Sequence, residues 1–76
     1  MPAFQITVVN DTFVSTNEQE FRDLNAAKRQ GLKAALEVGV EQVLDGQPLF
    51  GAEVIIAHGN ARERFIVTIG TSSLKE

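Results

Sequence analysis

Apolar and polar residues alternate near the start of the chain, and this alternation predicts β-strands. Single polar residues separate Phe4, Ile6 and Val8, so these three share one face of the first expected strand. Asn10 and Asp11 are typical turn residues and predict a hairpin to a short second strand. Two later segments are rich in β-branched residues, which favour strands. The sequence thus predicts strands at about residues 3–9, 12–15, 52–58 and 64–70.

Between the second and third expected strands, apolar residues recur with the period of an amphipathic helix. Asp23 is a good N-cap, because the helical pattern begins at Leu24. Gly46 provides a stop signal. We therefore expect a long helix at about 24–44, and residues 72–76 read as a tail.

The expected order of elements is β-β-α-β-β, which predicts one α+β domain over residues 1–76. Two antiparallel hairpins flank the helix, so the simplest architecture has two layers. In this arrangement one long helix covers one face of an antiparallel sheet, and the far face of the sheet stays partly apolar. The strand order within the sheet does not follow from the pattern.

Four small residues recur at a spacing of four along the expected helix and form a shallow groove on one face: Ala27, Gly31, Ala35 and Gly39. Each interior glycine costs the helix about 1 kcal/mol relative to alanine, so a close contact should offset that cost. Two alternatives are open. The groove admits bulky residues of the sheet, or it admits a second helix and is a candidate interface.

A row of charged residues has the same four-residue spacing: Arg29, Lys33, Glu37 and Glu41. The basic pair comes first and the acidic pair last, whereas the helix dipole favours the opposite order. Two helices lying antiparallel about a two-fold axis would place each basic half against the partner's acidic half. This row is therefore a second part of the candidate interface. The alternative is a solvated face whose charges contribute little.

The composition agrees with a small globular domain that gains stability from a partner. The chain has 76 residues, of which 43% are hydrophobic and 22% charged. A domain of this size buries only about 60% of the surface of its unfolded chain and usually needs a disulfide, a metal or a partner. The chain has no cysteine and one histidine. We therefore expect association, with a homodimer as the first reading and another protein as the alternative partner.

Charge and hydropathy limit the partners and the cellular compartment that we expect for the chain. The net charge of −3 disfavours general attraction to nucleic acid or anionic lipid. No apolar run approaches the roughly 20 residues of a membrane span, and the first residues do not resemble a signal peptide. The absence of cysteine fits a reducing compartment. We expect a cytoplasmic protein without a membrane partner.

Residues that could carry chemistry do not form a recognisable catalytic, cofactor-binding or metal-binding pattern. His58 is the single imidazole, and no nucleophile motif accompanies it. His58, Arg62 and Arg64 lie in or near the expected hairpin loop and form a small basic tip. This tip supports the alternative function, a small-ligand or nucleic-acid-binding protein. The first reading is a small interaction module that self-associates, is not an enzyme and needs no cofactor.

The chain resembles an uncharacterised family of small bacterial proteins, catalogued as a domain of unknown function. The resemblance spans almost the whole chain, although proline is common in that family where Arg22 stands here. It implies no activity and no site. It does imply that Phe50 packs on the helix and that Glu53 pairs with one of the two arginines of the hairpin. The segments that carry it are residues 10–15, 23–27, 34–39, 50–54 and 64–70.

Overall fold

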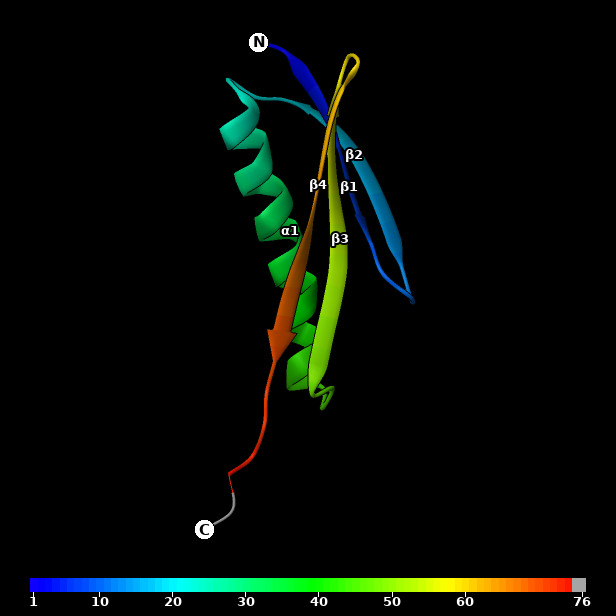
Figure 1. Cartoon of the computed structure of the whole chain (residues 1–76), viewed down its shortest axis with the longest axis vertical. Coiled ribbons are helices and arrows are strands. Elements are labelled where there is room, and N and C mark those ends of the chain that lie inside the picture. The colour runs from blue at the N-terminus through cyan, green and yellow to red at the C-terminus, as the bar shows by residue number, and fades with distance from the viewer. Residues whose placement is uncertain (75–76) are drawn as a thin grey trace.

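The computed structural model describes residues 1–74 and has the predicted α+β architecture (Figure 1). One helix lies along one face of a four-stranded antiparallel sheet, as expected. The elements follow one another as β1 (Ala3–Val9), β2 (Val14–Glu20), α1 (Leu24–Leu44), β3 (Leu49–His58) and β4 (Ala61–Gly70). Of the expected tail, residues 72–74 have no regular structure, and residues 75–76 lie outside the described part.

The strand order across the sheet is β2-β1-β3-β4. The two hairpins therefore meet along β1 and β3, where Ile6 lies opposite Ile56 and Val8 opposite Val54. These side chains belong to the buried core between the sheet and α1. The helix packs on β3, β1 and β4, whereas β2 in the described chain makes no contact with it.

Both ends of α1 are set by local sequence signals. The Asp23 side chain accepts a hydrogen bond from the backbone N–H of Ala26 at 2.9 Å, which satisfies one free donor of the first turn. At the other end the backbone N–H groups of Gly46 and Gln47 donate to carbonyls of the last turns, in the pattern of a Schellman motif. Gly46 has φ of 108°, a conformation that favours glycine. The helix bounds are those predicted.

The groove of small residues lies against the sheet. Ala27, Gly31, Ala35 and Gly39 are the buried residues of α1. A Cβ on Gly31 would lie 2.8 Å from Val54 Cγ1, and one on Gly39 would lie 2.7 Å from Phe50 Cδ2. The first alternative therefore describes the groove: aliphatic side chains of the sheet and Phe50 pack against the two glycines. Close approach of helix and sheet requires glycine at both positions.

Three strand bounds differ from the prediction. The second strand is predicted at 12–15 but runs from Val14 to Glu20, and each of its residues is exposed. The third begins at Leu49, and the fourth begins at Ala61 rather than at residue 64. The last two are joined by a two-residue loop, in which Gly59 has a φ of 58°. Pairing with a neighbouring strand, rather than side-chain pattern, extends all three.

Candidate functional site

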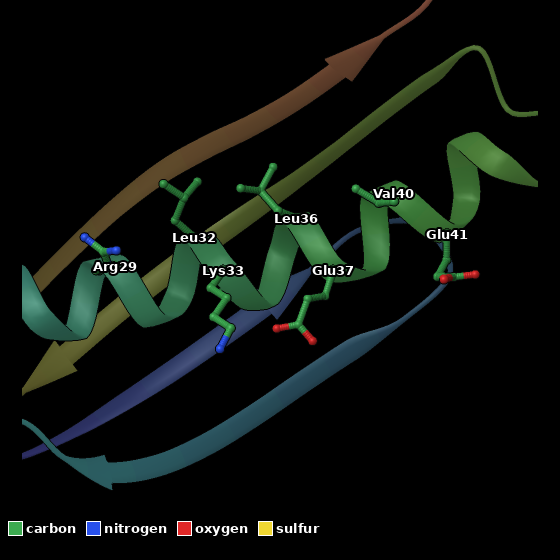
Figure 2. A pocket seen from close by; sticks show the side chains of 7 residues that line it. All are labelled: Arg29, Leu32, Lys33, Leu36, Glu37, Val40 and Glu41. Carbon is green, nitrogen blue, oxygen red and sulfur yellow. The ribbon is translucent and has the colours of Figure 1, made fainter.

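The outer face of α1 carries an apolar stripe that the sheet does not cover. Leu32, Leu36 and Val40 are spaced four residues apart and remain 40%, 38% and 49% exposed. With four charged neighbours these residues line one open groove along the helix (Figure 2). Single exposed apolar residues are common on protein surfaces, but a contiguous row is typical of a contact surface. We call this set the outer helix face: Arg29, Leu32, Lys33, Leu36, Glu37, Val40 and Glu41.

The charged residues of the outer helix face flank its apolar stripe. Figure 2 shows Lys33, Glu37 and Glu41 pointing to the side where β1 and β2 run, whereas Leu32 and Leu36 point to the side of β4. Within residues 1–74, none of the four charged side chains of this face forms an ion pair. They are therefore available to a partner.

Within one chain, this charge arrangement is unfavourable. Arg29 and Lys33 are like charges four residues apart, and so are Glu37 and Glu41. Such pairs destabilise a helix by about 0.2–0.5 kcal/mol each. Apart from the N-cap residue Asp23, no side-chain charge favours the helix dipole, since no acidic residue occupies the first turn of α1 and no basic residue the last. Lys33 and Glu37 form the one pair of opposite charges at this spacing in the row, so the row as a whole does not stabilise the isolated helix.

The small residues of the candidate interface, unlike its charged residues, face the sheet. Ala27 and Ala35 have no exposed surface, and the glycines beside them lie against the sheet of the same chain. This part of the predicted interface is corrected: a second helix cannot reach the groove, because the chain's own sheet already fills it. Arg29, Lys33, Glu37 and Glu41, by contrast, are exposed as a contact surface requires.

The candidate interface residues predicted from the sequence do not include Leu32, Leu36 or Val40. Each helical residue turns the side chain by about 100°. Leu32, Leu36 and Val40, which we also call the leucine row, each follow a residue of the small row by one position. The two rows therefore point in clearly different directions. This offset is the signal that could have identified the stripe, once the small row was known to face the sheet.

The basic hairpin tip does not come together as one site. The ring of His58 lies 4.7 Å from that of Phe4, and its Nδ1 is 2.8 Å from the carbonyl oxygen of Ala3. Because a carbonyl oxygen only accepts, Nδ1 carries the hydrogen. Arg64 instead forms an ion pair with Glu53 through its Nε, as the resemblance implied. Glu53 and Arg64 lie on the sheet face away from α1.

His58 and Arg62 both border a hollow of about 200 Å³ at the end of the sheet. Its other walls are largely apolar and include Phe4, Leu24 and Ile56. Arg64 is not part of it. Ligand or nucleic-acid binding at this end stays a prediction.

Titratable residues in the described chain do not gather into a site for a metal ion. Within residues 1–74, no three His, Cys, Asp or Glu side chains lie close enough to hold one. The acidic residues before the helix are spread along β2 and at the N-cap, where Glu20 contacts the N-terminal amine and Asp23 caps α1.

Within residues 1–74, no helix has the length and apolar character needed to cross a membrane.

No family model matches the chain, and no curated protein or solved structure matches it either. The resemblance to an uncharacterised bacterial family therefore stays a prediction, and the outer helix face is interpreted from its own chemistry.

Proposed function

We propose that this protein is a small non-enzymatic interaction module that self-associates through the outer helix face. One observation carries the proposal: Leu32, Leu36 and Val40 form a contiguous exposed apolar row on the only helix of the described residues. The small residues of that helix already pack against the sheet, so the leucine row is the continuous apolar surface that α1 offers to a partner, with Leu24 and Leu44 exposed nearer its two ends.

A second copy of the chain fits this surface better than an unrelated protein does. The outer helix face has two basic residues in one half and two acidic residues in the other, so its charge is balanced. A surface of this kind is complementary to itself when one copy is turned end for end. An unrelated partner would need to reproduce both charge signs in the same order beside an apolar row.

The apolar row of each chain contributes modestly to the free energy of association. Full burial of a leucine or valine side chain is worth about 1.5–3 kcal/mol. About two-fifths of that surface remains exposed on the three side chains, so covering it contributes about 1 kcal/mol each. Six such side chains meet in a dimer, whereas association itself costs at least about 4 kcal/mol. The apolar side chains leave about 2 kcal/mol after that cost, and four charge pairs between the two chains add about 0.2–1 kcal/mol each. We expect a weak dimer, with a Kd of roughly 40 µM to 6 mM.

Sedimentation equilibrium across that concentration range tests the proposal. The wild-type chain should shift from monomer to dimer as its concentration rises, and Leu36→Glu should remain a monomer because a buried unpaired carboxylate is costly. Ile66→Glu is the matched control, since Ile66 is 67% exposed on the sheet face away from α1. Circular dichroism verifies that each variant is folded, and Val40→Glu replaces Leu36→Glu if the latter unfolds.

Two results would contradict the proposal. The first is a wild-type chain that stays monomeric even at about 6 mM, the weak end of the expected Kd range. The second is a dimer that Ile66→Glu disrupts and Leu36→Glu leaves intact, because the contact would then lie on the sheet.

A further inference from the structure

We infer that the two chains of the dimer pair through antiparallel helices, with the two-fold axis passing close to Leu36. This inference rests on the proposed self-association and adds its orientation and register. The apolar row and the charged row of the outer helix face each determine where such an axis must lie, and the two answers can be compared.

The apolar row places the axis at Leu36. Its three members are Leu32, Leu36 and Val40, so an axis at the middle residue brings Leu36 against its own copy. It also brings Leu32 against the partner's Val40, and Val40 against the partner's Leu32. Every exposed side chain of the row then meets an apolar side chain.

The charged row places the axis almost at the same position. Pairing Arg29 with the partner's Glu41, and Lys33 with the partner's Glu37, requires an axis at residue 35. The axis differs by one residue from the apolar answer, so the charged partners are offset by two residues, or about 3 Å along the helix. Long charged side chains accommodate an offset of that size. The two rows therefore specify one register.

A parallel pair does not satisfy the same charges. When two helices pack face to face and run in the same direction, their charged rows fall on opposite sides of the contact. The basic halves then meet no acidic partner, and the like-charge neighbours within each helix stay unrelieved. The antiparallel pair instead places both charged rows on one side, where opposite charges meet along their length.

Disulfide cross-linking with single cysteine variants tests the register, because the chain has no cysteine of its own. A disulfide needs Cα atoms about 4.4–6.8 Å apart. At the axis, Leu36→Cys should cross-link to itself under mild oxidation. Leu32→Cys alone should not, since each copy lies four residues from the axis and the two are about 12 Å apart along the helix.

Mixing two variants identifies the orientation. Leu32→Cys and Val40→Cys chains should cross-link to each other much faster than either cross-links to itself. A parallel pair would give the reverse result, with efficient self-cross-linking at all three positions. Ile66→Cys, on the far sheet face, is the control for random collisions.

The outcomes separate this inference from the proposed function. If sedimentation shows a dimer but Leu36→Cys cross-links no faster than Ile66→Cys, or if Leu32→Cys cross-links to itself as fast as Leu36→Cys does, the register is wrong and self-association stands. If the wild-type chain is monomeric throughout, both fail together.

Charge exchange provides an independent readout of the charge pairing between the two helices. Arg29→Glu with Lys33→Glu makes the row wholly acidic, and Glu37→Lys with Glu41→Lys makes it wholly basic. Each double variant should dimerise on the order of tenfold more weakly than the wild type, and an equal mixture should recover the dimer. A mixture no stronger than its components would overturn the charge pairing.

Discussion

Gly39→Ala should destabilise the fold, although alanine is the better helix former. Gly39 lies where α1 approaches the sheet, and an added Cβ would stand 2.6 Å from Ile69 Cδ1 and 2.7 Å from Phe50 Cδ2. Carbon atoms in good contact are about 3.5–4.0 Å apart. The end of Ile69 can move, but the ring of Phe50 is only 2% exposed and has little room.

Two effects of opposite sign decide the magnitude. The helix gains about 1 kcal/mol when alanine replaces an interior glycine. Overpacking a filled core costs about 1–3 kcal/mol, because rings and backbone must shift. The net loss in the free energy of unfolding should be about 1 kcal/mol. In a domain of this length that corresponds to about 4–8 °C in Tm.

Thermal and urea unfolding followed by circular dichroism measure this change. All variants are compared at one protein concentration, since the proposed dimerisation would make Tm depend on concentration. Gly51→Ala is the control: Gly51 lies in β3, its φ is not positive, and a Cβ there would meet nothing within 4 Å. That variant should gain about 0.5–1 kcal/mol, the usual benefit of alanine over glycine in a strand. If Gly39→Ala raised Tm as Gly51→Ala does, the close packing of helix on sheet would be refuted.

Two further substitutions probe local features of the fold. Asp23→Ala removes the hydrogen bond to the Ala26 N–H and should cost about 1 kcal/mol in the free energy of unfolding, measured by urea denaturation; Asp23→Asn, which keeps an acceptor, should lose less. Glu53→Gln and Arg64→Gln break one ion pair, so a double-mutant cycle should give a coupling of about 0.2–1 kcal/mol, small because Arg64 is largely exposed. Strictly additive effects would show that the pair contributes nothing.

Features encoded by neighbouring residues could be predicted from the sequence. The bounds of α1 follow from Asp23 at its start and Gly46 at its end, both of which act within a few residues. The first strand follows from the alternation that begins at Phe4. The resemblance implied a pair of Glu53 with one of two arginines, and the structure selects Arg64, which the two strands of one hairpin bring diagonally beside Glu53. Each of these features depends on contacts close in sequence.

The extent of β2 could not be predicted in the same way. Residues 15–20 are all polar and exposed, so no side-chain pattern marks them as a strand. Their backbone pairs with β1, as when Asn17 lies opposite Ile6, and this pairing defines the strand. A strand held mainly by backbone hydrogen bonds, here with one side-chain hydrogen bond between Thr7 and Thr16, leaves no periodic apolar signal.

The sequence by itself determined the elements of the hairpins and the helix, because caps, turns and periodicity act locally. Tertiary structure alone decided that β1 lies beside β3 and that the small row of α1 faces the sheet. The physical reason is steric: the aliphatic side chains of β3 and the ring of Phe50 fill the space that Gly31 and Gly39 leave. A helix that presented its leucines to the sheet would stand farther from it. The leucine row therefore remains on the surface, where a second copy can meet it.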